Sequence, residues 1–146
     1  MKLSKKGEYG IRAVCHLAEH HNGGVIHIRQ IANQESIPAK FLESILLQLK
    51  RAGIVKSRRG VEGGYSLARS PDDIMLGEVI RILDGPLAPL GNVSELKEMM
   101  VQNPRQAGLY GILIDVRNAA SLILDRTSLS QVVVRNLEHR ARGGVS

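Results

Sequence analysis

One stretch of this 146-residue chain decides its fold, Lys56-Ser57-Arg58-Arg59-Gly60-Val61-Glu62-Gly63-Gly64-Tyr65-Ser66-Leu67-Ala68. Ile54 and Val55 precede the turn, and Tyr65 and Leu67 follow it, an alternation of apolar residues that is typical of two short strands. The glycines between them permit the positive φ angles of a tight tip. The stretch therefore predicts a short basic β-hairpin.

The tip of this hairpin carries two guanidinium groups, from Arg58 and Arg59, beside the nearly bare backbone at Gly60. Guanidinium groups bind duplex phosphates and enter the minor groove. A glycine-rich turn that cradles a nucleotide phosphate is the alternative, but no glycine-Lys-Ser/Thr ending follows and no long helix opens at Gly64. We therefore expect Arg58, Arg59 and Gly60 to contact DNA.

Two short helices precede the hairpin. One is expected over 29–35, and after the turn Ser36-Ile37-Pro38 the other runs over about 38–52, with Pro38 at its first helical position. Apolar residues recur in the second helix at helical spacing: Phe41, Leu42, Ile45, Leu46 and Leu49. Two helices and a hairpin in this order predict a winged helix-turn-helix, with the helix-turn-helix at about 28–51 and the wing at about 54–68.

The start of the second helix offers Lys40, Glu43 and Ser44, at the place where such folds meet base edges in the major groove. Lys40 suits guanine or a phosphate, and Glu43 suits a cytosine amino group. Arg29 and Gln30 open the first helix of the motif, where backbone N–H groups and side chains often fix a phosphate. For all of them an ordinary solvated helix face is the alternative.

A helix capped by Ser4 is expected to run to about His21. Lys5 at its start is a further candidate for a phosphate contact, with a purely solubilising role as the alternative. Cys15 lies on the apolar stripe of this helix, which favours a buried small hydrophobe over a redox sensor. His16 and His20 are one turn apart, but no third ligand of clear spacing accompanies them, so we expect no metal.

Charge is divided unequally between the two halves of the chain. The net charge is +6, and residues 1–70 hold 12 Lys/Arg against 5 Asp/Glu while residues 71–146 hold 8 against 9. A positive field confined to one half suggests that this half faces a polyanion. A single cysteine, no signal sequence and no apparent membrane span favour a cytoplasmic protein without a membrane partner. No constellation of catalytic residues rises above coincidence, so enzymatic activity is not expected.

The second half is organised around one long helix. After a short strand at 74–76 and a short helix at 77–83, we interpret 87–106 as a connecting or sensing loop. An apolar helix over about 107–126 and a last helix over 129–137 would form a dimerisation region at 107–140, followed by a loose tail at 141–146. The residues predicted to line the dimer interface are Leu109, Ile112, Leu113, Val116, Ala120 and Ile123.

The N-terminal winged helix-turn-helix region, residues 1–86, which we call the head, closely resembles the Rrf2 family of bacterial winged-helix transcription regulators. This family includes iron–sulfur cluster and nitric oxide sensors. The resemblance rests on Leu46 to Val55, on Arg58 to Arg69, on Leu76-Gly77-Glu78-Val79-Ile80 with Gly85-Pro86, and on Tyr9-Gly10-Ile11-Arg12-Ala13. It implies a homodimer that reads an inverted-repeat operator, with its recognition helices in successive major grooves and its wings in the minor groove.

One departure from this family concerns the cofactor. Many members hold an iron–sulfur cluster with three cysteines in the loop after the glycine-proline, whereas 87–106 contains no cysteine. Glu8 occupies a place from which relatives supply a carboxylate ligand, but without thiolates we interpret it as a surface residue. The sequence thus predicts a mainly α protein with a small β-wing, a winged helix-turn-helix head with a long dimerisation helix, that acts as a cofactor-free homodimeric repressor.

Other partners stay open at this stage. An effector molecule or a partner protein could supply the signal in place of a cluster. The alternative function is a protein-interaction module, or a small-molecule-responsive partner of a metabolic enzyme, with weak DNA binding.

Overall fold

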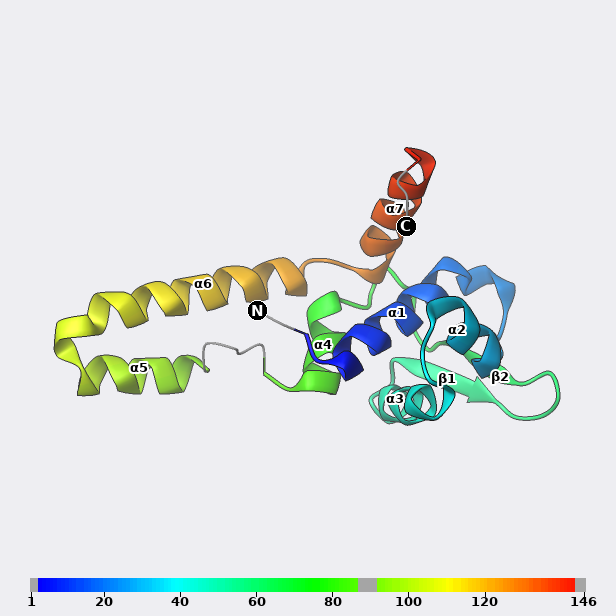
Figure 1. Cartoon of the computed structure of the whole chain (residues 1–146), viewed down its shortest axis with the longest axis horizontal. Helices are drawn as coiled ribbons and strands as arrows, with labels where there is room; N and C mark the ends of the chain where they lie inside the picture. Colours follow the sequence, from blue (N-terminus) through cyan, green and yellow to red (C-terminus); the bar gives the residue numbers. More distant parts are fainter. Residues whose placement is uncertain (1–2, 87–91, 144–146) are drawn as a thin grey trace.

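The computed structural model describes residues 3–86 and 92–143 and consists of a compact head with a projecting arm (Figure 1). The elements of the head are α1 (Lys5–Glu19), η1 (His21–Gly23), α2 (Ile28–Glu35), α3 (Ala39–Arg51), β1 (Val55–Arg58), β2 (Gly64–Leu67) and α4 (Leu76–Asp84). The second half contains α5 (Val93–Gln102), η2 (Pro104–Gln106), α6 (Ala107–Asp125) and α7 (Leu129–Ala141). The predicted fold class, mainly α with a small β-wing, is confirmed.

Helix α1 is the centre of the head and packs against α2, α3, α4, β2 and α7. It begins where expected, because the Ser4 hydroxyl accepts a hydrogen bond from the Gly7 N–H at 3.0 Å and so caps the first turn. One apolar core joins the elements, and its fully buried side chains include Val14, Leu17, Ile31, Leu42, Ile45, Leu46, Leu49 and Ile54. Burial of these residues holds the helix-turn-helix against α1.

The wing is an antiparallel pair of strands in which Val55 lies opposite Leu67 and Arg58 opposite Gly64. Ile26, from the segment between α1 and α2, extends this pair, since it exchanges two backbone hydrogen bonds of 2.8 Å with Tyr65. Strand β2 therefore pairs with β1 along one edge and with Ile26 along the other, and the contact with Ile26 anchors the wing to the head.

Two local expectations for this part of the chain were wrong. Pro38 is the residue before α3 and not its first helical residue. Ile54 precedes β1, where it is fully buried in the core.

The arm consists of α5 and α6, which lie side by side and run away from the head (Figure 1). The interpretation of 87–106 as a loop is wrong for its second part, because α5 is a helix with a capping box between Asn92 and Glu95. The first part, residues 87–91, lies outside the described residues. Leu96 is the one buried residue of α5, whereas α6 has none.

The segment that follows α6 pairs with the residues just before α4. Met75 forms a single bridge with Ser128, and Leu76 begins α4, so a strand over 74–76 is not formed. Ser128 caps α7 through its hydroxyl, paired with Gln131 in a capping box. Helix α7 continues to Ala141, so the expected tail begins too early; residues 144–146 lie outside the described part of the chain.

Candidate nucleic-acid interface

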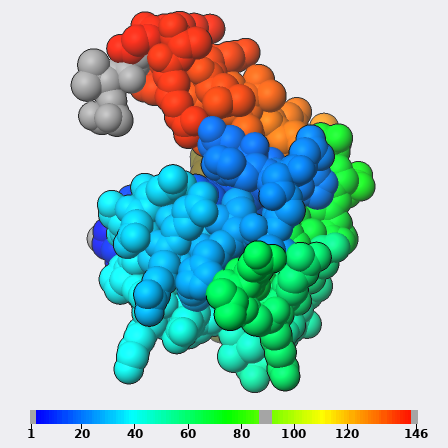
Figure 2. Space-filling view, turned by 90° about the vertical axis from the view of Figure 1, so that its right-hand side faces the viewer, coloured from blue at the N-terminus to red at the C-terminus, as the bar shows by residue number. Residues whose placement is uncertain are grey.

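The α2–α3 region and the wing lie next to each other on one face of the head (Figure 2). The apolar side of α3 is buried, and this orientation directs its other side outward. Lys40, Glu43 and Ser44 are all exposed on that outer side. The Ser44 hydroxyl donates to the Phe41 carbonyl at 2.7 Å, so only its acceptor capacity remains for a ligand. Lys40 and Glu43 form no ion pair with any described residue.

The wing presents Arg58 and Arg59 to solvent, and neither takes part in an ion pair within residues 3–86 and 92–143. Gly60 adopts φ 108°, a conformation that favours glycine and lets the tip turn sharply. A shallow pocket with a volume of about 340 Å³ lies between the wing and the start of α2. Its lining residues include His27, Arg58, Arg59 and Gly60. Its charged side chains are all basic, which suits a phosphate.

The remaining predicted DNA contacts lie on α1 and α2. Arg29 and Gln30 are exposed in the first turn of α2, where the His27 side chain accepts from the Arg29 N–H at 3.2 Å. Lys5 lies 3.6 Å from Glu8 and above the ring of Tyr9, which in turn meets Phe41 edge to face. Lys5 therefore borders the start of α3, although part of its charge is compensated by Glu8.

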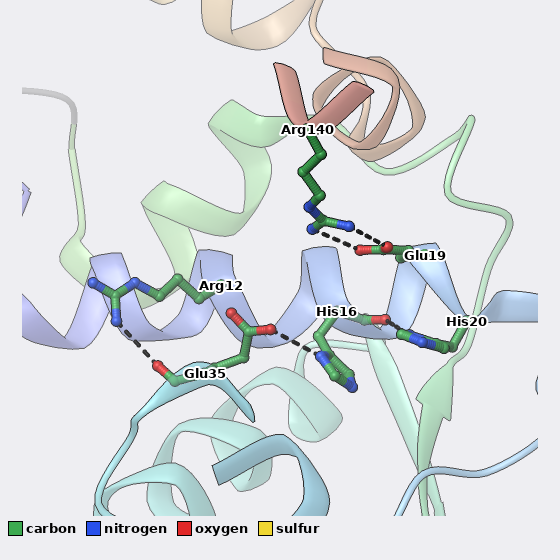
Figure 3. A network of polar contacts seen from close by, with 6 residues as sticks. All are labelled: Arg12, His16, Glu19, His20, Glu35 and Arg140. Atoms are coloured by element: carbon green, nitrogen blue, oxygen red, sulfur yellow. Dashed lines mark hydrogen bonds and ion pairs between the residues drawn. The ribbon is translucent and has the colours of Figure 1, made fainter. Parts of the chain in front are cut away.

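A polar network around α1 was not anticipated from the sequence (Figure 3). His16 is buried, and its Nδ1 lies 2.9 Å from a carboxylate oxygen of Glu35 at the end of α2. Arg12 donates to the Glu35 carbonyl at 3.1 Å, so two residues of α1 hold the end of α2. On the other side of α1, Arg140 of α7 donates to Glu19 at 2.6 and 3.2 Å, which lowers the pKa of that carboxyl.

The buried position expected for Cys15 is observed, and burial, reinforced by Glu35 and Glu19, raises the pKa of its thiol to about 12. His20 stacks on His16, but its Nδ1 donates to the His16 carbonyl. No group of three or more metal-ligating side chains occurs among residues 3–86 and 92–143. His16 and His20 thus pack together on α1, and His27 caps α2.

The apolar residues predicted for a dimer interface lie along the arm. Leu109, Ile112, Val116 and Ile123 are between 49% and 66% exposed, while Leu113 and Ala120 are half-buried. By length and composition, Pro104–Asp125 could also cross a membrane, so the expectation that no stretch approaches a span was wrong by that measure. Asp115 and Arg117 lie in its middle, where charged side chains are costly in lipid.

A family described as "Rrf2: Iron-dependent Transcriptional regulator" matches residues 3–135. The chain belongs to the Rrf2 family. It is 35% identical to the transcriptional regulator CymR of Bacillus subtilis over 132 residues, which cover 90% of this chain and 89% of the relative. It is 38% identical to IscR of Aliivibrio salmonicida over 84 residues, which cover 58% of this chain and 50% of that relative.

Solved Rrf2-family structures agree with this assignment. The B. subtilis CymR structure, described as that of a global cysteine regulator, superposes with a TM-score of 0.78 at 32% identity and covers 92% of this chain and 98% of its own. IscR of T. potens superposes with a TM-score of 0.72 at 32% identity, covering 93% of this chain and 88% of its own. The chain is therefore a DNA-binding transcriptional regulator with a winged helix-turn-helix, and not an enzyme.

The iron in the family description does not fit the donor set of this chain. The one cysteine, Cys15, is enclosed in the core of α1 with its thiol pKa raised to about 12, so it is not a thiolate at neutral pH. An iron–sulfur cluster needs several thiolate or imidazole ligands around one point. Within the described residues no such group exists.

Proposed function

We propose that this Rrf2 protein is a homodimeric repressor that binds an inverted-repeat operator without an iron–sulfur cluster. The observation that supports it most is that Arg58 and Arg59 of the wing tip and Lys40 at the start of α3 are exposed and form no ion pair with any described residue. Lys40, Glu43 and Ser44 are the proposed contacts in the major groove. Arg58, Arg59 and Gly60 are the proposed contacts of the wing with the minor groove and its flanking phosphates. Lys5, Arg29 and Gln30 are proposed to contact phosphates at the border.

The proposal of a homodimer is supported by the arm. A helix of 19 residues without a single buried side chain would be marginal in water, because most helical stability in proteins comes from packing. A second copy would cover Leu109, Ile112, Val116 and Ile123 and would place two heads on one duplex. Twofold symmetry of the protein then requires an inverted repeat in the operator.

Repression by a cluster-free protein requires another signal. An effector molecule or a partner protein acting on the arm is the proposed source, in a protein that we place in the cytoplasm. The signal would act by changing how the two heads are spaced.

The test is selection of duplexes from a random pool by the purified protein, followed by affinity measurements at several salt concentrations. We expect an inverted repeat and a log–log salt slope that becomes less steep by about 1.8 in Arg59→Gln, since each phosphate contact contributes about 0.9 and a dimer has two wings. Arg105→Gln, a charge change on the arm, is the control and should leave the slope unchanged. Failure to enrich any sequence would contradict the proposal.

Base recognition is tested separately with Glu43→Gln and Lys40→Ala on the selected operator and on its single-base variants. A residue that reads bases changes the ranking of these variants by about 1–3 kcal/mol at one position of each half-site. An equal loss on every sequence would reduce the residue to a phosphate contact or a structural role.

A further inference from the structure

Among the described residues, the arm packs against the head at a junction where the end of α6 meets α4. Arg81 of α4 forms a bidentate pair with the carboxylate of Asp125, in which the Nη2–Oδ2 distance is 2.9 Å. The same guanidinium donates to the Ser121 hydroxyl at 2.8 Å, one turn earlier in α6. Three hydrogen bonds from one planar group therefore define both the position and the rotation of this end of α6.

Backbone contacts reinforce the junction. The Leu76 N–H donates to the Thr127 carbonyl at 2.8 Å, and the Leu129 N–H donates to the Ile74 carbonyl at 2.9 Å. Gly77 permits the close approach of the two helices, because a Cβ there would lie 2.3 Å from Oδ1 of Asp125 and 3.2 Å from the carbonyl carbon of Leu124. The junction is thus closely packed and polar, and a side chain at position 77 would have to displace the Asp125 carboxylate.

The rest of α6 adds little that could hold its direction. None of its residues is buried, and its other large contact is with α5, which moves with it as part of the arm. With 19 residues, α6 is a lever of about 28 Å. A tilt of about 7° at the junction displaces its far end by about 3.4 Å, which equals one base-pair step of duplex DNA.

We infer that Arg81, Asp125 and Ser121, together with Gly77, set the spacing between half-sites that the dimer accepts. This inference rests on the proposed homodimer, in which the angle between head and arm determines the distance between the two recognition helices. One inserted base pair shifts a half-site by about 3.4 Å and rotates it by about 34°, so a rigid junction discriminates strongly against it. These four residues position the heads, and none of them is among the proposed DNA contacts.

The arginine pair is well suited to this role and poorly suited to stabilising the fold. Arg81 and Asp125 are 38% and 44% exposed, and ion pairs at such exposure contribute little to global stability. Removing the pair therefore leaves the buried core of the head intact while it frees the lever. This separation of effects makes the inference testable with folded protein.

The experiment measures affinity of the full chain for the selected operator and for versions with one or two base pairs added to or removed from its centre. We expect the affinity of the wild type to fall about tenfold or more for each base pair added or removed. For Arg81→Met and Asp125→Asn the affinity should fall about threefold or less per base pair, and their affinity for the operator of best spacing should be only a few-fold below that of the wild type. Arg126→Met is the control, because Arg126 is exposed beside the junction and forms no ion pair within the described residues. It should keep the wild-type spacing profile.

A charge-reversed double variant, Arg81→Asp with Asp125→Arg, provides the second readout. It should again lose affinity steeply when base pairs are added to or removed from the centre of the operator. Unchanged spacing profiles in both Arg81→Met and Asp125→Asn would overturn the inference while leaving the proposed function standing. A wild-type protein that enriches no duplex would instead contradict the proposed function, and this inference with it. Sedimentation of each variant shows whether it is still a dimer, and a monomeric Arg81→Met would also overturn a role in spacing alone.

Discussion

Gly64→Ala should detach the wing from the head. A Cβ at position 64 would lie 2.3 Å from the Ile26 carbonyl oxygen and 2.9 Å from the His27 nitrogen, and both neighbours are backbone atoms that cannot rotate away. Ordinary contact requires about 3.5 Å, so the strand must retreat by about 1 Å. The two 2.8 Å hydrogen bonds between Ile26 and Tyr65 would then exceed the range of a hydrogen bond.

The expected magnitude follows from these two bonds. Each contributes about 0.5–1.5 kcal/mol, so the free energy of unfolding should fall by about 1–3 kcal/mol. A wing that must dock again when it meets DNA also weakens binding, by up to roughly 5- to 150-fold for the same free energy. Urea unfolding and operator affinity measure the two effects.

Gly23→Ala is the matched control for this variant. Nothing lies within 4 Å of a Cβ at position 23, and its φ is not in the left-handed region. Its free energy of unfolding should therefore stay within about 0.5 kcal/mol of the wild type. Equal urea midpoints for Gly64→Ala and Gly23→Ala would refute the anchoring of the wing through Ile26.

Three further predictions concern the core and the network of Figure 3. Ile45→Ala removes a fully buried side chain and should cost about 2–5 kcal/mol in urea unfolding, whereas Glu43→Ala on the exposed face of α3 should change stability by about 0.5 kcal/mol or less. Cys15 should react with iodoacetamide at pH 8 at least about tenfold more slowly in the folded than in the unfolded protein, because burial raises the pKa of its thiol to about 12; equal rates would contradict burial. The Arg140 hydrogen bonds lower the pKa of Glu19, so their stabilisation is present above the unfolded pKa of this carboxyl and is lost as pH falls through the folded value. Arg140→Gln should accordingly lower the melting temperature at pH 7 but not at pH 2, and a pH-independent difference would rule out this ion pair as the cause.

The head was predictable because its local signals agree with its packing. The Ser4 hydroxyl caps the first turn of α1, and the spacing of apolar residues in α3 matches its buried face. The glycines of the wing favour a tight turn. Each of these signals lies within a few residues of the structure that it specifies. The family resemblance over the same segment added the expected arrangement of these parts.

Helix α5 was missed for a physical reason. Its N-terminal signal, Asn92 with Glu95, is a capping box that the sequence displays, but we expected at most one turn of helix at 95–100 within a connecting or sensing loop. The helix buries only Leu96, so no broad apolar stripe marks it. Its stability depends on contact with α6, which local sequence does not reveal.

The contacts that hold the arm against α4 and the polar network around α1 could not be predicted either. Arg81 and Asp125 are 44 residues apart, and Glu19 and Arg140 are 121 apart. Their pairing depends on how α4, α6 and α7 return to α1. The contact of Ile26 with Tyr65 is of the same kind, because it joins residues that are far apart in the sequence.

The bare surface of α6 has a consequence for how gene expression would respond to the amount of this protein. If pairing of two chains supplies the packing that α6 lacks, the DNA-binding form accumulates with the square of the monomer concentration when the protein is scarce. A twofold fall in copy number then reduces operator occupancy by up to fourfold. The promoter under its control would switch over a narrower range of protein level than a monomeric binder permits.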